Sequence, residues 1–156
     1  MKNAMILLAF CFLMACKSKK DSVSKTESIK IERIADTEIN EVQKDKTTAL
    51  GNQILMTCNT SKFKPLTDKE ATAEVRKNMT VDRLTKTCLK FKLKYGDFKE
   101  LKFIEAYQTK TDKIIIYRFK ALYEKKIANK ELRITVNQNN QIAAIKSKDW
   151  VSDFHL

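Results

Sequence analysis

Glycine, proline and histidine are nearly absent from this chain, which holds two glycines, one proline and one histidine in 156 residues. A glycine-rich phosphate loop needs several glycines close together, whereas Gly51 and Gly96 are far apart. A catalytic triad or a zinc site would have to use His155, the penultimate residue, and chain ends are usually poorly ordered. We therefore expect no catalytic residue, no metal and no cofactor, and we favour a protein that is not an enzyme.

Arginine is also scarce. The chain has 31 basic and 19 acidic side chains and a net charge of +12, but only five of the basic residues are arginine. Bidentate recognition of phosphates and bases favours arginine, so this composition argues against specific nucleic-acid binding. The densest basic patch is either an ordinary solvated surface or one that attracts anionic lipid head groups or polyanionic glycans. It consists of Lys90, Lys92, Lys94, Lys99 and Lys102.

An uncharged apolar segment at residues 4–15 follows Lys2. Its length suits a signal peptide and falls short of the roughly 20 residues that span a bilayer. The segment ends in Leu13, Ala15 and Cys16 and resembles the lipobox of bacterial lipoproteins. The resemblance implies cleavage after Ala15, acylation of Cys16 with fatty acids such as palmitate, and membrane anchoring. The alternative is an ordinary secretory signal in which Cys16 is incidental.

The rest of the chain divides by composition. Residues 17–46 contain no aromatic residue, glycine or proline and mix charges of both signs, which is typical of a solvated tether. The predicted organisation is a signal peptide at 1–15, a lipidated cysteine with its tether at 16–46, and a single α+β domain at 47–156. By analogy with lipoproteins, Lys17 in place of an aspartate favours the outer membrane, on either its periplasmic or its surface side.

Three helices are predicted before residue 97. A first helix ends near Cys58 and can begin as early as Ile39, because Leu50 and Ile54 recur at helical spacing. A second and a third are predicted from a capping-box spacing and from an apolar stripe that stops at a glycine. The second opens at Thr67 with Glu70 and carries Ala71, Val75 and Met79; the third carries Val81, Leu84, Cys88 and Phe91 and stops at Gly96.

The second half of the chain changes to a period of two, which predicts four strands. Short connections at 109–113, 125–130 and 137–141 require neighbouring strands to be antiparallel. The expected fold is α+β, with the helices packed on one face of a curved antiparallel four-stranded sheet. The residues sharing a face are Leu101, Phe103, Glu105 and Tyr107 in the first strand; Ile115, Tyr117, Phe119 and Ala121 in the second; Leu132, Ile134 and Val136 in the third; and residues 142–150 form the fourth.

This order of elements resembles a known superfamily. A long helix, two short helices ending in Tyr95, Gly96 and Phe98, and a meander with an asparagine-rich turn at 137–142 are similar to the cystatin-like or nuclear-transport-factor-2-like domains of bacterial lipoproteins. The lysine-rich, arginine-poor composition is similar to lipoproteins of the Bacteroidetes. The resemblance implies a cone-shaped sheet with room for a pocket, and it implies no particular chemistry.

Two of the four cysteines remain to be placed, since Cys11 lies in the leader and Cys16 would carry lipid. Cys58 and Cys88 form an even pair in a compartment where disulfides persist. Both also lie on predicted apolar helix stripes, so they are either a disulfide or two small buried side chains.

Glu105 is the one candidate acid or base. Glu105 is two residues from Phe103 and four from Leu101, so its side chain is expected on the same face, pointing into the cone. Burial there would raise the pKa of its carboxyl group. Tyr107 and Tyr117 could complete a pocket. The alternative is a glutamate at the rim that pairs with Arg118 or with a lysine of the next strand. Trp150 either closes the end of the sheet or lines the pocket.

Two functions follow from these observations. The first is a membrane-anchored, non-enzymatic binding or interaction module of the bacterial envelope, with an envelope protein as partner. The second is a small-molecule binder, or a simple acid-base enzyme, that uses the interior of the cone with Glu105.

Overall fold

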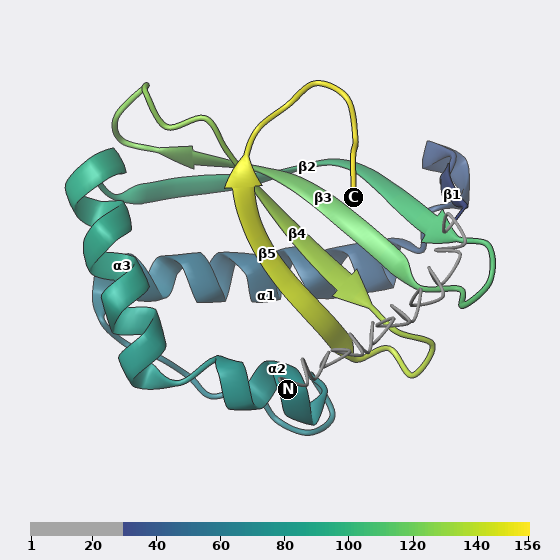
Figure 1. Cartoon of the computed structure of the whole chain (residues 1–156), viewed down its shortest axis with the longest axis horizontal. Coiled ribbons are helices and arrows are strands. Elements are labelled where there is room, and N and C mark those ends of the chain that lie inside the picture. The colour runs from purple at the N-terminus through teal and green to yellow at the C-terminus, as the bar shows by residue number, and fades with distance from the viewer. Residues whose placement is uncertain (1–29) are drawn as a thin grey trace, which may run out of the picture.

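One antiparallel sheet organises residues 30–156, the part of the chain that the computed structural model describes (Figure 1). The strands follow the order β1-β2-β3-β4-β5. The strands are β1 (Ile31–Arg33), β2 (Phe98–Thr109), β3 (Ile115–Tyr123), β4 (Lys130–Val136) and β5 (Ile142–Asp149); the helices are α1 (Glu41–Thr60), α2 (Ala73–Asn78) and α3 (Val81–Tyr95), with a 3-10 turn η1 (Asp36–Glu38). The expected α+β class and the antiparallel pairing are confirmed.

The first and third predicted helices are confirmed as α1 and α3. The side chain of Asn40 accepts a hydrogen bond from Gln43 N at 3.0 Å and caps the start of α1. Thr80 caps α3 in the same way. Gly96, with φ at +76°, ends α3 in a backbone conformation that other residues rarely adopt.

The second predicted helix begins later than expected. Thr67 N and Oγ1 both donate to Glu70 Oε2, at 2.8 and 2.9 Å, but only a single turn follows. The backbone then runs beside β5, where Ile142 N donates to Glu70 O and Thr72 N donates to Ile142 O, each at 2.9 Å. These pairings replace helical hydrogen bonds, so α2 starts at Ala73.

The sheet has five strands where four were predicted. The extra strand is β1, whose residues Ile31 and Arg33 pair with Thr109 and Tyr107 of β2. The folded elements therefore begin before residue 47, inside the segment expected to be a tether. Three residues are too few to show a period of two, which is why this strand was missed.

Helix α1 packs across the middle of one face of the sheet. In Figure 1 it runs behind the strands. The closest approach is at Gly51, where a Cβ atom would lie 2.6 Å from Leu101 Cδ2 and 3.2 Å from Leu132 Cδ2. The centre of this face of the sheet, at Gly51, therefore has no room for a ligand. The core also takes in Ile39, Leu50, Ile54, Ala106, Tyr117, Phe119 and Ile134.

Helix α3 stands at one end of the sheet and is joined to α1 covalently. A disulfide links Cys58 of α1 to Cys88 of α3, with the Cα atoms 4.6 Å apart, so of the two alternatives for this pair the structure has the disulfide. No helix among residues 30–156 is long and apolar enough to cross a membrane. The leader predicted at 1–15 and the lipidation site at Cys16 lie outside the described residues.

Candidate functional site

A β-bulge in β2 decides where the candidate acid points. Phe103 pairs with Phe119, but the register then shifts and Glu105 pairs with Arg118. The extra residue turns Glu105 and Tyr107 to the face opposite α1, whereas Leu101 and Phe103 pack toward α1. The prediction that these four residues share one face is wrong. A β-bulge shifts the alternation of the two faces by one residue, and the spacing of apolar residues in the sequence does not reveal it.

Glu105 is held by two arginines. Its Oε1 accepts a hydrogen bond from Arg118 Nη1 at 2.7 Å, and its Oε2 lies 3.4 Å from Arg33 Nε. Its side chain is 13 % exposed. Of the two predictions for Glu105, the structure has the one in which it pairs with Arg118. The other, in which Glu105 points into the interior of the sheet, is wrong.

Glu105 belongs to a buried charge cluster that also contains Arg118, Glu131 and Arg133. Arg118 Nε donates to Glu131 Oε2 at 2.6 Å, and Arg133 Nε donates to Glu131 Oε1. Arg118 and Glu131 are fully buried and Arg133 is nearly so. Two cations and two anions neutralise one another, which is the condition for burying charges at all.

The last seven residues, 150–156, cover this charge cluster on the face away from α1 (Figure 1). The carbonyl oxygens of Val151 and His155 accept hydrogen bonds from Arg118 Nη2 and Arg133 Nη1. The Trp150 ring lies 4.1 Å from the Arg118 guanidinium, and the Phe154 ring lies 4.5 Å from that of Arg133. Trp150 therefore covers a buried charge and does not line a ligand pocket.

Tyr107 is part of the same cover. Its ring stacks on that of Phe154, with centroids 3.9 Å apart and planes 15° apart. Burial first, and then the neighbouring Glu105 carboxylate, raise the pKa of Tyr107. Its ring therefore helps the C-terminal segment to seal the charge cluster.

Tyr117 lies on the opposite face, beneath α1. Its hydroxyl donates to Gln43 Oε1 at 2.5 Å, and Gln43 Nε2 donates to Asn140 Oδ1 at 2.7 Å. Burial raises the pKa of Tyr117 to about 12, so it stays neutral near pH 7. The four residues predicted to form one pocket are thus divided between the two faces of the sheet.

Among residues 30–156, one cavity lies near each end of α1 on the helical side. One of about 290 Å³ lies between the start of α1 and the β4–β5 turn, and is lined by Gln43, Lys46, Glu70 and Asn140 among others. The other, of about 250 Å³, lies between α1, α3 and β5 and is mostly apolar. It is lined by Leu55, Met79, Phe91, Tyr123, Leu132 and Ile145 among others, and burial raises the pKa of Tyr123 to about 12. No sequence pattern pointed to either cavity.

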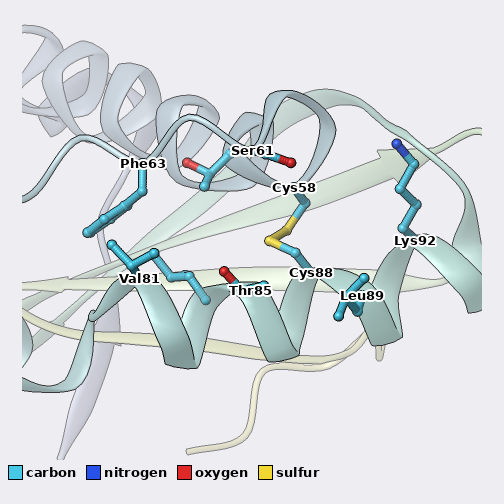
Figure 2. A pocket seen from close by; sticks show the side chains of 10 residues that line it. Cys58, Ser61, Phe63, Val81, Thr85, Cys88, Leu89 and Lys92 are labelled. Atoms are coloured by element: carbon cyan, nitrogen blue, oxygen red, sulfur yellow. A yellow bond between two sulfur atoms is a disulfide. The ribbon is translucent and has the colours of Figure 1, made fainter.

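A groove between α1 and α3, which we call the helix groove, lies directly over the disulfide (Figure 2). Its volume is about 160 Å³, and Phe63 faces Val81 and Thr85 across it. Val81 and Leu89 are exposed although both are apolar. Val81 belongs to the predicted apolar stripe of this helix, but it is 58 % exposed and lies with Thr85 and Leu89, at a spacing of four, on a line beside the buried Cys88.

Residues 30–156 contain no group of three or more histidine, cysteine, aspartate or glutamate side chains arranged to hold a metal ion. The carboxylates of the charge cluster, Glu105 and Glu131, line neither the two cavities nor the helix groove. Comparison with protein-family models, with curated proteins and with solved structures gives no match for this chain.

Proposed function

We propose that this chain is a lipid-anchored, non-enzymatic binding module of the bacterial envelope. The lipobox-like residues Leu13, Ala15 and Cys16 support the anchor, and the Cys58–Cys88 disulfide is consistent with an oxidising compartment. Lys17 supports the outer membrane as the location. An envelope protein bound in the helix groove is the proposed partner.

One observation carries the choice of binding over catalysis. Glu105, the one candidate acid or base, is neutralised by Arg118 and Arg33 on the face that the C-terminal segment covers. An acid or base catalyst must reach the proton that it transfers. Exposed apolar side chains, in contrast, gather along the helix groove and on α3, and such side chains favour contact with another surface.

We also propose that the domain is a divergent cystatin-like or nuclear-transport-factor-2-like cone. The long α1 across an antiparallel meander, and the bulge that bends β2, support this relationship. Under this proposal α1 fills the cone at Gly51, so a ligand or partner would bind at the ends of α1 or on the outer surface.

The anchor is tested on the full chain expressed in a bacterium that processes lipoproteins. The purified chain should begin at Cys16 and carry the mass of its acyl groups. Replacement C16S should release the protein from the membrane fraction. A chain that begins at another residue, or a C16S protein that remains in the membrane fraction, would contradict lipid anchoring.

The partner is tested by site-specific cross-linking in intact cells. A photoreactive amino acid at Thr85, in the helix groove, should give one discrete cross-linked protein, and the same amino acid at Gln138, on the exposed β4–β5 turn, should not. The additional replacement F63S should reduce the yield at Thr85. Equal products from both positions, or none from Thr85, would count against a partner in the helix groove.

The apolar cavity between α1, α3 and β5 favours a second function, which is binding of a small apolar molecule. A cavity of about 250 Å³ with few polar groups suits a ring or a short alkyl chain. The fluorescent probe 1-anilinonaphthalene-8-sulfonate should bind the folded protein and lose affinity in L84W, which fills the cavity. Unchanged affinity would remove this function.

A further inference from the structure

A tip at one end of the molecule combines exposed aliphatic side chains with lysines. Leu89 and Leu93 of α3 are 60 % and 79 % exposed, and Ile127 in the β3–β4 loop is 76 % exposed. The loop is fastened to the end of α3, since Lys125 Nζ donates to Leu93 O at 2.9 Å and Lys125 N donates to Tyr95 O at 3.0 Å. Figure 1 shows this loop beside the C-terminal end of α3. We call this surface the aliphatic tip.

The charges around the aliphatic tip are mostly positive. Leu89 and Leu93 are four residues apart and lie on one line of the helix, and the exposed Lys86 and Lys90 flank this line. Lys94 and Lys126 add two more exposed positive charges at the end of α3 and in the loop. The one acidic residue of α3 is Asp82, in its first turn, away from this end.

We propose that the aliphatic tip docks on an anionic lipid surface. Each lysine near such a surface gains electrostatic energy, and its long stem lets the charge reach the head groups while the aliphatic side chains enter the interface. Lysine is a point charge that needs no fixed partner geometry, which suits a fluid layer of head groups. A polyanionic glycan would use the lysines and give no role to Leu89, Leu93 and Ile127, so the exposed aliphatic side chains favour lipid.

The dimensions of the chain allow the anchor and the aliphatic tip to contact the same bilayer. The first described residue, Lys30, directly precedes β1 and accepts a hydrogen bond from Lys110 N at its carbonyl oxygen. Figure 1 shows β1 at the end of the molecule opposite α3. Helix α1, with 20 residues, runs between the two ends and is about 30 Å long. Residues 17–29 can reach at most about 45 Å. This inference rests on the proposed anchor, which would hold the aliphatic tip close to lipid.

The test is lysine footprinting of the full chain, processed in the cell and reconstituted in vesicles. One set of vesicles is phosphatidylcholine, and the other contains phosphatidylglycerol as well. Acetylation by a water-soluble reagent is followed by mass spectrometry at Lys86, Lys90 and Lys126. The exposed Lys113, in the β2–β3 turn at the other end of the molecule, is the internal control.

We expect the reactivity of the three tip lysines to fall several-fold on the anionic vesicles only, and to recover in high salt. Reactivity of Lys113 should not change. The double variant L89S/L93S should lose the protection although every lysine remains, whereas V42S, which removes an equally exposed aliphatic side chain from the start of α1, should keep it. Both changes lie at exposed positions, so the fold should be retained, and circular dichroism checks this.

Two results would overturn the proposal. One is equal reactivity of the tip lysines on both kinds of vesicle. The other is protection that persists in L89S/L93S or that soluble heparin reproduces, because charge alone would then explain it. Failure of the anchor is recognised separately, by a missing acyl mass on Cys16, and vesicles added to that protein still test the aliphatic tip.

Discussion

Replacing Glu131 by glutamine should destabilise the protein more than any surface change. The side chain is fully buried and joins two buried arginines, with Arg118 Nε at 2.6 Å from Oε2 and Arg133 Nε on the other oxygen. E131Q keeps the shape but removes the carboxylate that pairs with Arg133 and leaves Arg118 with Glu105 alone. Removing one partner of a buried pair costs about 3–5 kcal/mol, a large part of a typical stability of about 5–15 kcal/mol.

Urea unfolding followed by circular dichroism measures this loss, with the disulfide kept oxidised. At about 4 °C per kcal/mol for a domain of this size, the melting temperature should fall by about 12–20 °C. The control is K110A, which breaks the exposed pair between Lys110 and Glu32 and should cost less than about 1 kcal/mol. A loss below about 1 kcal/mol in E131Q would refute the view that the charge cluster is buried and mutually dependent.

Three further predictions concern the helical side. Replacing both Cys58 and Cys88 by alanine should lower the free energy of unfolding by about 3–4 kcal/mol on the chain-entropy estimate, measured against the oxidised protein in urea; no loss would mean that the bond adds no constraint. G51A should cost about 1–3 kcal/mol, because its Cβ atom would lie 2.6 Å from a leucine side chain of β2; a neutral thermal shift would show that α1 can move away. Stability should fall between pH 10 and 12, because burial raises the pKa of Tyr117 and of Tyr123 to about 12 while unfolded tyrosines ionise near 10; urea unfolding across this range should show a smaller fall in Y117F/Y123F, and an equal fall would mean that these tyrosines do not cause it.

Much of the fold could be predicted from the sequence, because apolar spacing indicates the type of each element. Helix α3 carries its apolar stripe up to Gly96, and most of β3 and β4 alternate apolar and polar residues in sequence, so the type of these elements is readable. The alternation does not report burial there, because both strands have four consecutive buried residues. The strand β1 is different. It is three residues long, and its pairing with β2 is set by backbone hydrogen bonds that no side-chain pattern reports.

The candidate site could be predicted less well, and the bulge in β2 is the reason. A single extra residue after Phe103 exchanges the faces for the rest of the strand, so Glu105 meets Arg118 instead of the core. The contacts of Trp150 and Phe154 depend on how the chain turns after β5, which composition does not reveal. Pairing of Glu105 with Arg118 could be proposed from neighbouring strands, but the burial of Glu131 between two arginines could not.

The cover of the charge cluster has a consequence for how the protein is made. Arg118 and Arg133 bond to the carbonyl oxygens of Val151 and His155, which belong to the last six residues of the chain. Both residues follow β5 in the chain, so they are synthesised after all five strands. The outer face of the sheet therefore stays open until this segment has packed on it, and the two arginines are the last part of the sheet to be covered.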